Sequence, residues 1–436
     1  MRFMTFHVAV ALVPLLAFSA GGSASAASAP ETAATAEDVV PAMPFKEGDV
    51  IGMDQIDKIR DYIPKPFWEN RDFFFYEGMK LKIGPFYKDY PVSEERKAAN
   101  AKFGGQARIG RDDSLENYTM GKPFPEIDPS DPYAGAKHAW NYHYRHDALE
   151  GKASFYFSYW DNGEALPLSF QGSGWAMRLA NRPDHMDRNG DIFNKEKRMG
   201  AGGVYVAGPP DFRGIRGLGY AYKAMDAPRD KARDLDIWVY IPDLRRVRRI
   251  SGSTRTDPVA GTDMIPEDSG GFTGVIPQFH WKYVGEVDLL APIDTRLTGY
   301  PYSKDESFGP SGFSLGNDEW QLRHAIILDM FPKEQHPYKR KRLWVDKQTY
   351  TPLFAAAYDR HGELWKLIYM NNRWSEREDQ PKRIRGINTF LRTCNIVVNI
   401  QIGTGVRIET FDVQPTRLRR GQIRKLTDIG RLNRGH

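Results

Sequence analysis

The chain has 436 residues, a formal net charge of +5 at neutral pH and one cysteine, Cys394. A single cysteine excludes an intramolecular disulfide, so a packed core must stabilise the fold. The nearly balanced charge excludes a strongly basic or strongly acidic protein.

The first 26 residues have the pattern of a secretion signal. Arg2 precedes an apolar run at residues 8–20, and Ala24, Ser25 and Ala26 form an A-x-A cleavage site. The run is shorter than the roughly 20 residues that span a membrane. We therefore expect export to the periplasm, cleavage before Ala27 and no nucleic-acid partner. Because the only cysteine lies far downstream, a lipid-anchored lipoprotein is excluded.

The two segments that follow the predicted signal are expected to differ in how well ordered they are. Residues 27–48 are rich in Ala, Ser, Pro and Glu, which favours a flexible leader. Residues 49–150 are predicted to form a helical N-terminal elaboration. Its helices are expected at residues 53–62, at residues 93–103 with Ser93 as N-cap, and from Asp131 to Tyr144.

From about residue 152 the pattern changes to short β-rich runs between Gly, Pro, Asn and Asp clusters. The candidate strands are residues 154–160, 203–207, 218–225, 236–241, 246–250, 280–290, 322–330, 341–345, 353–358, 364–370, 383–391, 395–402 and 406–413. Without repeats or interleaved long helices, a propeller, a solenoid and a doubly wound sheet are disfavoured. We predict a mainly β (α+β) fold in which residues 151–436 form a large curved antiparallel sheet. Residues 49–436 are expected to be one structural unit.

Three blocks in the middle of the chain carry a family resemblance. Residues 236–250 read DIWVYIPDLRRVRRI and lead to GTDMIPED at residues 261–268. Residues 267–285 read EDSGGFTGVIPQFHWKYVG, and KRLWVD at 341–346 precedes AYDRHGELW at 357–365. In this order they resemble the outer-membrane lipoprotein-sorting-like proteins, and more narrowly the domain-of-unknown-function family 1329. His280 stands where that family usually has Asp.

The resemblance implies a half-open β-barrel whose concave apolar face is covered by helices and suits a lipid or another hydrophobic molecule. It also implies a non-catalytic carrier without a cofactor. The implied partners are an inner-membrane transporter of the resistance-nodulation-division type or an outer-membrane protein. From the aromatic strands, the residues placed on the cavity wall are Phe155, Phe157, Tyr159, Trp238 and Tyr240.

Charged residues in these blocks allow two interpretations. Arg245, Arg246, Arg248 and Arg249 form either a solvated edge that discourages strand pairing or a docking patch. Asp263, Glu267 and Asp268 are expected to pair with those arginines across a loop; the alternative is a carboxylate acid–base site. A second basic cluster ends the chain, at Arg417, Arg419, Arg420, Arg424, Lys425, Arg431 and Arg434.

Several motifs resemble catalytic or metal-binding motifs but lack the surrounding sequence that such sites need. Ser314 lies in G-x-S-x-G, but a Pro/Gly/Ser-rich loop surrounds it, so an exported hydrolase is only an alternative function. The other alternative is a scaffold of an envelope complex that docks through the Arg-rich surfaces. Asp187, Asn189 and Asp191 match part of a calcium loop, where an Asn-Gly turn is the simpler interpretation. His138, His143 and His146 lack zinc-site spacing, and no metal site is predicted.

Overall fold

The computed structural model describes residues 43–145, 150–162, 164–192, 197–250, 255–296, 309–315 and 317–434, without the side chains of 165–167. The predicted signal peptide, residues 27–42 of the predicted leader and His146 lie outside these ranges.

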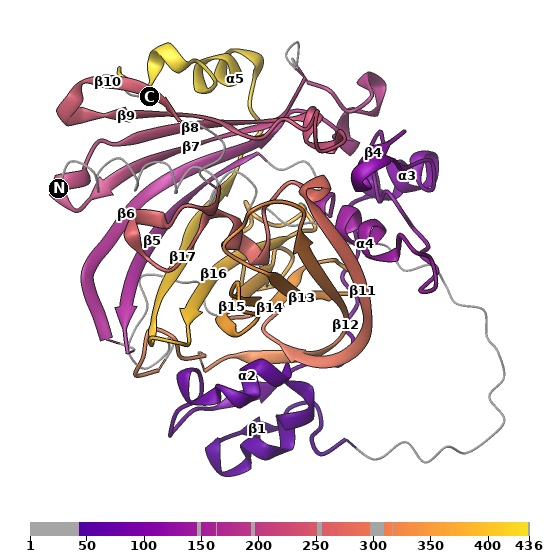
Figure 1. Cartoon of the computed structure of the whole chain (residues 1–436), viewed down its shortest axis with the longest axis vertical. Coiled ribbons are helices and arrows are strands. Elements are labelled where there is room, and N and C mark those ends of the chain that lie inside the picture. Colours follow the sequence, from indigo (N-terminus) through magenta and orange to yellow (C-terminus); the bar gives the residue numbers. More distant parts are fainter. Residues whose placement is uncertain are drawn as a thin grey trace.

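A curved 15-stranded sheet dominates the structure (Figure 1). Alternating apolar residues in these segments favour strands with one or both faces buried. The strands are β1 (Val50–Ile51), β2 (Leu81–Ile83), β5 (Gly151–Asp161), β6 (Glu164–Arg178), β7 (Arg198–Gly208), β8 (Arg216–Tyr222), β9 (Asp236–Ile241), β10 (Arg246–Ile250), β11 (Phe279–Ala291), β12 (Glu319–Pro332), β13 (Arg340–Asp346), β14 (Pro352–Tyr358), β15 (Leu364–Trp374), β16 (Phe390–Asn399) and β17 (Thr404–Pro415). A separate pair consists of β3 (Arg108–Ile109) and β4 (Leu115–Glu116).

The sheet runs from β1 at one end to β10 at the other and does not close into a barrel. Its order is β1-β2-β12-β13-β14-β15-β16-β17-β5-β6-β7-β8-β9-β10, with β11 also paired to β12. The pairings are antiparallel except that of β2 with β12, so the sheet is mixed rather than wholly antiparallel. The pairing of β17 with β5 joins the C-terminal strands to those that follow residue 150.

Several predicted strands differ from the observed ones in their bounds, and the largest differences are at two places. The bounds predicted for β9 and β10 agree with the structure, but β6 was not predicted at all. The strand predicted at residues 383–391 is wrong, because β16 begins only at Phe390 and turns precede it.

Helices are short and flank the sheet. The predicted helix at residues 53–62 is a 3-10 helix, whereas α3 begins directly after Ser93, whose hydroxyl accepts a hydrogen bond from the Arg96 amide over 3.2 Å. The α-helices are α2 (Lys65–Glu69), α3 (Glu94–Phe103), α4 (Ala134–His143) and α5 (Arg420–Leu426). The 3-10 helices are η1 (Met53–Tyr62), η2 (Arg71–Phe73), η3 (Arg111–Asp113), η4 (Pro183–Arg188), η5 (Pro210–Phe212), η6 (Lys223–Asp226), η7 (Pro242–Leu244), η9 (Val259–Gly261), η10 (Pro266–Gly271), η11 (Ile276–Gln278) and η12 (Ile429–Arg431).

Three large apolar clusters cover the two faces of the sheet. The inner cluster fills the concave face together with α4 and residues 259–279. A second cluster packs residues 45–90 on the outer face of β12–β16. The third packs α5 and Leu432 on the outer face of β6–β9. The sheet therefore has a cover on each side, and the inner cover lies where a ligand cavity was expected.

Candidate functional site

The inner face of the curved sheet is apolar over most of its strands. Phe155 and Phe157 on β5 are at most 1% exposed, and Ile237, Val239 and Ile241 on β9 are likewise buried in the inner cluster. Because side chains alternate along a strand, these residues share one face of their strands. Their neighbours on the same face are Phe170, Val204, Val206, Leu328, Met330, Leu343, Val345, Ile368, Met370, Val397, Val406 and Ile408.

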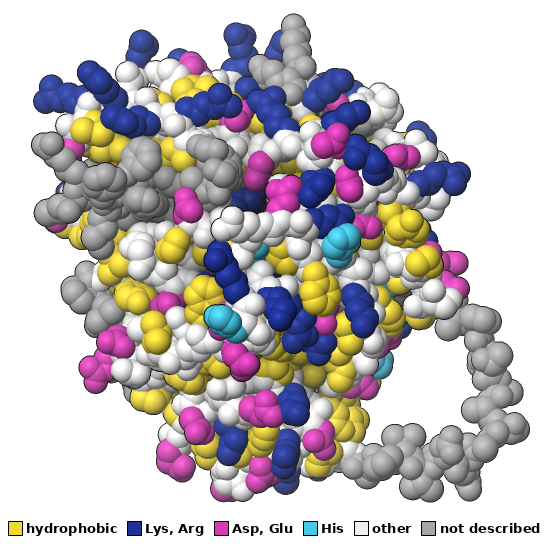
Figure 2. Space-filling model, viewed as in Figure 1, with side chains coloured by type: hydrophobic (Ala, Val, Ile, Leu, Met, Phe, Trp, Pro, Cys, Tyr) yellow, Lys and Arg dark blue, Asp and Glu magenta, His cyan; other side chains and the backbone are white. Residues whose placement is uncertain are grey.

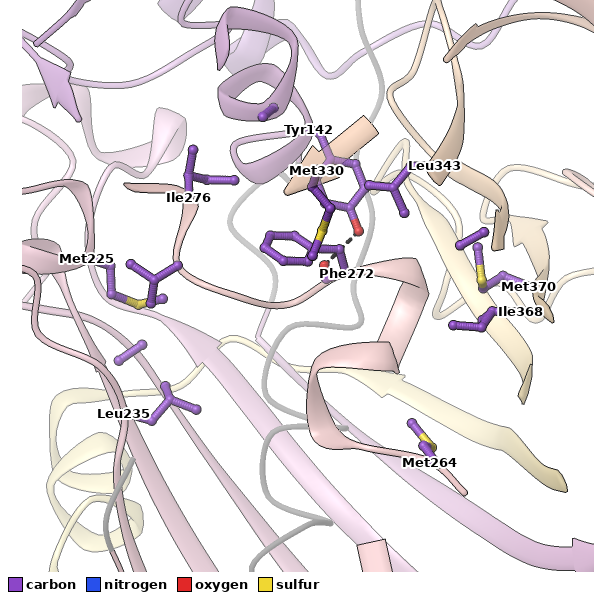
Figure 3. Close-up of a cluster of buried hydrophobic side chains, with 14 of the residues drawn as sticks. Tyr142, Met225, Leu235, Met264, Phe272, Ile276, Met330, Leu343, Ile368 and Met370 are labelled. Atoms are coloured by element: carbon purple, nitrogen blue, oxygen red, sulfur yellow. Dashed lines mark hydrogen bonds between the residues drawn. The ribbon is translucent and has the colours of Figure 1, made fainter. Parts of the chain in front are cut away.

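One stretch of chain lies across this face, which we call the inner segment (residues 255–278). Its apolar side chains Met264, Phe272 and Ile276 belong to the inner cluster. The Tyr142 hydroxyl of α4 lies 2.8 Å from the carbonyl oxygens of both Gly270 and Phe272, so α4 and the inner segment form one cover (Figure 3).

Methionines are prominent where this cover meets the sheet. Met225, Met264, Met330 and Met370 lie within the same inner cluster (Figure 3). Met side chains are unbranched and polarisable and adapt to irregular apolar shapes. The contact between cover and sheet can therefore repack around different apolar groups.

Buried charges hold the inner segment at η10. The Lys341 ammonium of β13 lies 2.7 Å from Asp268, and the side chains of both residues are 0% exposed. The Tyr338 hydroxyl donates to the same carboxylate over 2.8 Å, and Lys366 of β15 lies 3.8 Å away. Burial by itself would raise the pKa of Asp268, but the two lysines lower it below its usual value. Asp268 is therefore an ionised and fully buried anchor of the inner segment.

Asp263 forms a second polar anchor for the inner segment. Its carboxylate accepts hydrogen bonds from Asn399 over 2.7 Å, from Thr404 over 2.5 Å and from Tyr159 over 3.3 Å. A third contact joins the Gly270 amide to the Asn395 side chain over 2.8 Å. The cover is thus fixed by a few directional contacts to β5, β13, β16 and β17.

The structure corrects the expected partners of the three acidic residues. Asp263 and Asp268 bind the groups above, and Glu267 lies 3.3 Å from His336, so none of these contacts involves the four arginines of residues 245–249. Those four arginines are exposed at the edge of the sheet. Among them, Arg249 pairs with Asp236 over 2.6 Å.

The five predicted cavity-wall residues fall on both faces of the sheet. Phe155 and Phe157 lie buried on the inner face, and Tyr159 is half-buried beside Asp263. Trp238 and Tyr240 instead pack in the outer cluster beneath α5. The reason is the alternation of β9, where Ile237 and Val239 take the inward positions. The structure therefore does not bring the two aromatic sets together.

Sequence reasoning missed Lys341 and Lys366. Both lie in strands at positions where the alternation places buried apolar neighbours, Leu343 and Ile368. A lysine in an inward position is the signal that could have revealed an internal counter-charge. Their pairing with Asp268 depends on the placement of the inner segment, which the local sequence does not define.

Comparison with known proteins gives the family. A model of the family described as "Protein of unknown function (DUF1329)" matches residues 53–417. This chain belongs to the DUF1329 family. The match confirms the family that the sequence blocks had indicated.

Relatives of this DUF1329 protein are distant. An uncharacterized protein of Pseudomonas aeruginosa is 23% identical over 135 residues, which is 30% of this chain and 30% of that protein. A solved DUF1329 family protein of Desulfovibrio piger is 19% identical, with a TM-score of 0.46, covering 70% of this chain and 100% of that one. A LolA superfamily protein of Nitrosomonas europaea is 12% identical, with a TM-score of 0.35, covering 62% of this chain and 88% of that one.

In the other candidate motifs of the DUF1329 chain, the named side chains make contacts that stabilise loops and turns. Ser314 is buried in a loop that leads to β12, and its hydroxyl accepts a hydrogen bond from the Ser311 amide over 3.2 Å. The strand–turn–helix context of a serine nucleophile is absent from residues 309–315 and from the strand that follows. Asp191 pairs with Lys223 over 2.7 Å, next to an Asn-Gly turn.

Two of the three candidate histidines, His138 and His143, lie on α4 and pack against the interior. His138 lies 2.9 Å from the Tyr350 hydroxyl, and burial lowers its pKa to about 4. Burial also lowers the pKa of His143, to about 3. Among the described residues, no group of three or more His, Cys, Asp or Glu side chains is arranged to hold a metal ion. Within the same ranges, every helix is too short or too polar to span a membrane.

One cavity of the DUF1329 protein opens elsewhere, between α3, η4 and the loop before β16. It has a volume of about 310 Å³. Charged side chains line it, among them Glu95, Glu150, Arg182, Asp184 and Arg383. Such a lining is unsuitable for an apolar ligand, so the inner face remains the candidate site.

Proposed function

We propose that this protein is a non-catalytic carrier that binds a lipid or another hydrophobic molecule between the inner face of the sheet and the inner segment. The observation that carries the proposal is the cover itself. An apolar concave face lies beneath a segment that Asp263, Asp268 and Gly270 fix through directional contacts. A ligand can replace the apolar contacts of such a cover while the sheet stays intact.

The energetics favour an exchange of this kind. Each buried methylene contributes about 0.8 kcal/mol, so an acyl chain offers a gain similar to that of the displaced side chains. The cost is the opening of the inner segment, which lowers the apparent affinity by the fraction of open molecules. The flexible methionines reduce this cost because they refill the gaps beside a bound chain.

The secretion signal of the sequence supports a periplasmic site of action for this carrier. We propose that it receives or delivers its ligand at a membrane protein of the cell envelope. The family resemblance favours an inner-membrane transporter of the resistance-nodulation-division type or an outer-membrane protein. The acidic residues of the inner segment have structural partners, which agrees with a carrier that performs no catalysis.

Site-specific photocrosslinking tests the proposal with a matched pair of half-buried tyrosines. A photoreactive phenylalanine analogue replaces either Tyr159 on the inner face or Tyr240 on the outer face. Protein purified from its own cell envelope is irradiated and examined by mass spectrometry. We expect a lipid or other hydrophobic adduct at position 159 and none at position 240.

Native mass spectrometry of the unmodified protein provides the second measurement, because it detects a bound molecule without any substitution. A protein that carries no hydrophobic molecule and gives no adduct at either position would rule out the carrier function. Equal adducts at both positions would indicate nonspecific surface binding and would also contradict the proposal.

A further inference from the structure

The fold brings together two basic segments that lie far apart in the sequence. One is the turn and strand at residues 242–250, and the other is the C-terminal stretch 417–434 with α5. Figure 1 shows α5 beside β8, β9 and β10, at the end of the molecule opposite α2. We call this surface the basic end, formed by residues 242–250 and 417–434.

Packing fixes the two segments to each other. Ile423 of α5 and Leu432 are buried in the cluster that also contacts Trp238, Tyr240 and Val247. The Arg216 guanidinium of β8 donates to the Leu432 carbonyl over 3.0 Å. The basic end is therefore a defined surface of the folded protein.

The charge of this surface is strongly one-sided. It contains eleven basic residues and the two acidic residues Asp243 and Asp428. All eleven basic side chains are exposed: Arg245, Arg246, Arg248, Arg249, Arg417, Arg419, Arg420, Arg424, Lys425, Arg431 and Arg434. The ion pairs of Arg249 with Asp236 and of Arg431 with Asp428 reduce this charge only partly. Figure 2 shows Lys and Arg side chains along this end.

The hairpin tip adds an apolar side chain to the charge. Leu244 is 39% exposed and directly precedes Arg245, whose φ of 48° forms the turn into β10. An apolar residue that is followed by two arginines, Arg245 and Arg246, suits the boundary between lipid headgroups and acyl chains. The charges extend over an edge strand and a helix, and long basic side chains spread in this way match the lateral array of headgroup phosphates in a bilayer.

We propose that the basic end binds the surface of a membrane rich in anionic phospholipid. Each Lys or Arg near such a surface raises the binding constant for the membrane roughly fivefold, and salt weakens this electrostatic attraction. This surface lies on the rim and outer side of the sheet, so the proposal is independent of any ligand inside it.

Vesicle sedimentation with the full-length protein tests the proposal. Vesicles contain phosphatidylcholine alone or with one-quarter phosphatidylglycerol. We expect binding to the anionic vesicles at least tenfold stronger than to the neutral ones, and weaker binding at high salt. Two triple variants each reverse three charges: Arg245, Arg246 and Arg248 to Glu, or Arg419, Arg424 and Lys425 to Glu. Each should lower binding to anionic vesicles by at least tenfold.

A control variant reverses three exposed charges at the opposite end, Lys58, Arg60 and Lys65 to Glu, and changes the net charge equally. It should bind anionic vesicles nearly as well as the parent protein. If the control variant loses as much binding to anionic vesicles as the test variants, the loss depends only on net charge and the proposal is overturned. Equal binding of the parent protein to both vesicle types would also overturn the proposal, and so would undiminished binding of both test variants to anionic vesicles. A parent protein that does not bind anionic vesicles and binds only an acidic protein would overturn it too.

Discussion

Asp226 lies in η6 beside α4, where the Tyr144 hydroxyl donates to its carboxyl group over 2.5 Å. Burial raises the pKa of Asp226 to about 7. The unfolded chain has the ordinary pKa near 4, so the folded state holds this proton more tightly. The stability that the protonated group contributes is fully present below about pH 4 and is lost as the pH rises to about 7.

The Asp226→Asn variant should not lose stability as the pH rises, because an amide does not titrate. Its side-chain oxygen still accepts a hydrogen bond from Tyr144. We expect similar stability of the two proteins near pH 4. At pH 8 the variant should be more stable, by an amount on the order of 4 kcal/mol. Urea unfolding across this pH range measures the difference. A difference that does not change with pH would show that Asp226 does not titrate in this window.

Asp268 illustrates the opposite case, a buried carboxylate that must stay charged. The Asp268→Asn variant leaves Lys341 and Lys366 without their counter-charge inside the sheet. We expect a loss of about 3–5 kcal/mol in the free energy of unfolding, measured by urea titration. Asp257→Asn, at an exposed position of the same inner segment, should cost less than about 0.5 kcal/mol.

A double variant separates charge from packing. Adding Lys341→Met to Asp268→Asn removes one uncompensated ammonium and should recover part of the lost stability. If the double variant is no more stable than Asp268→Asn alone, the buried ion pair does not determine the loss.

At the scale of elements, the inner segment is the part expected to open. Thr404 of β17 donates to Asp263, and Thr404→Val removes this contact while keeping the side-chain volume. One lost hydrogen bond of about 1 kcal/mol should increase the open fraction roughly fivefold. If the carrier proposal is correct, the apparent affinity for a fluorescent fatty acid should rise by a similar factor.

The control for this measurement is Thr427→Val, which removes a hydroxyl contact with the Ile423 carbonyl at the end of α5, on the outer side of the sheet. It should leave the affinity for the fatty acid unchanged. An unchanged affinity in Thr404→Val would mean that the Asp263 anchor does not govern access to the interior.

The local sequence predicted strands well where apolar and polar residues alternate clearly. It predicted them poorly where contacts with other strands determine which residue a position can hold. β9 and β10 follow their aromatic and β-branched pattern. β6 was missed because Gly172 and Gly174 weaken strand propensity. The structure explains Gly172: a Cβ there would lie 2.9 Å from the Phe155 ring and closer still to the Tyr205 carbonyl. Packing against β5 and β7 therefore requires a residue that local propensity disfavours.

The site was predictable only in part. The GTDMIPED block was recognised, and the residues of β5 were assigned to the inner face. In β9 the alternation was read in the wrong phase, because Ile237 and Val239, not Trp238 and Tyr240, point inward. The block's position across the inner face depends on contacts with Lys341, Asn395 and Thr404, from three strands distant in sequence. Only the assembled sheet brings these residues to one place.

For the whole molecule, α5 determines whether the outer face of β6–β9 is protected. Ile423→Asp places a charge at a buried contact of α5 with the outer cluster. We expect α5 to detach and the exposed apolar face to cause self-association, measured by light scattering and binding of a hydrophobic dye. Gly421→Asp introduces the same charge at an exposed neighbour and should leave the protein as it was. A monomeric Ile423→Asp variant that binds no dye would show that α5 is dispensable as a cover.

The pairing of β5 with β17 has a consequence for the order of folding. Strands β5 to β10 can form successive hairpins early in synthesis, but their link to the rest of the sheet waits for residues 404–415. The first two strands likewise wait for β12. Such distant pairings fold slowly because the intervening chain must first be ordered. A nascent chain therefore carries unpaired strand edges until residues 404–415 have emerged, and it needs protection from aggregation over that whole interval.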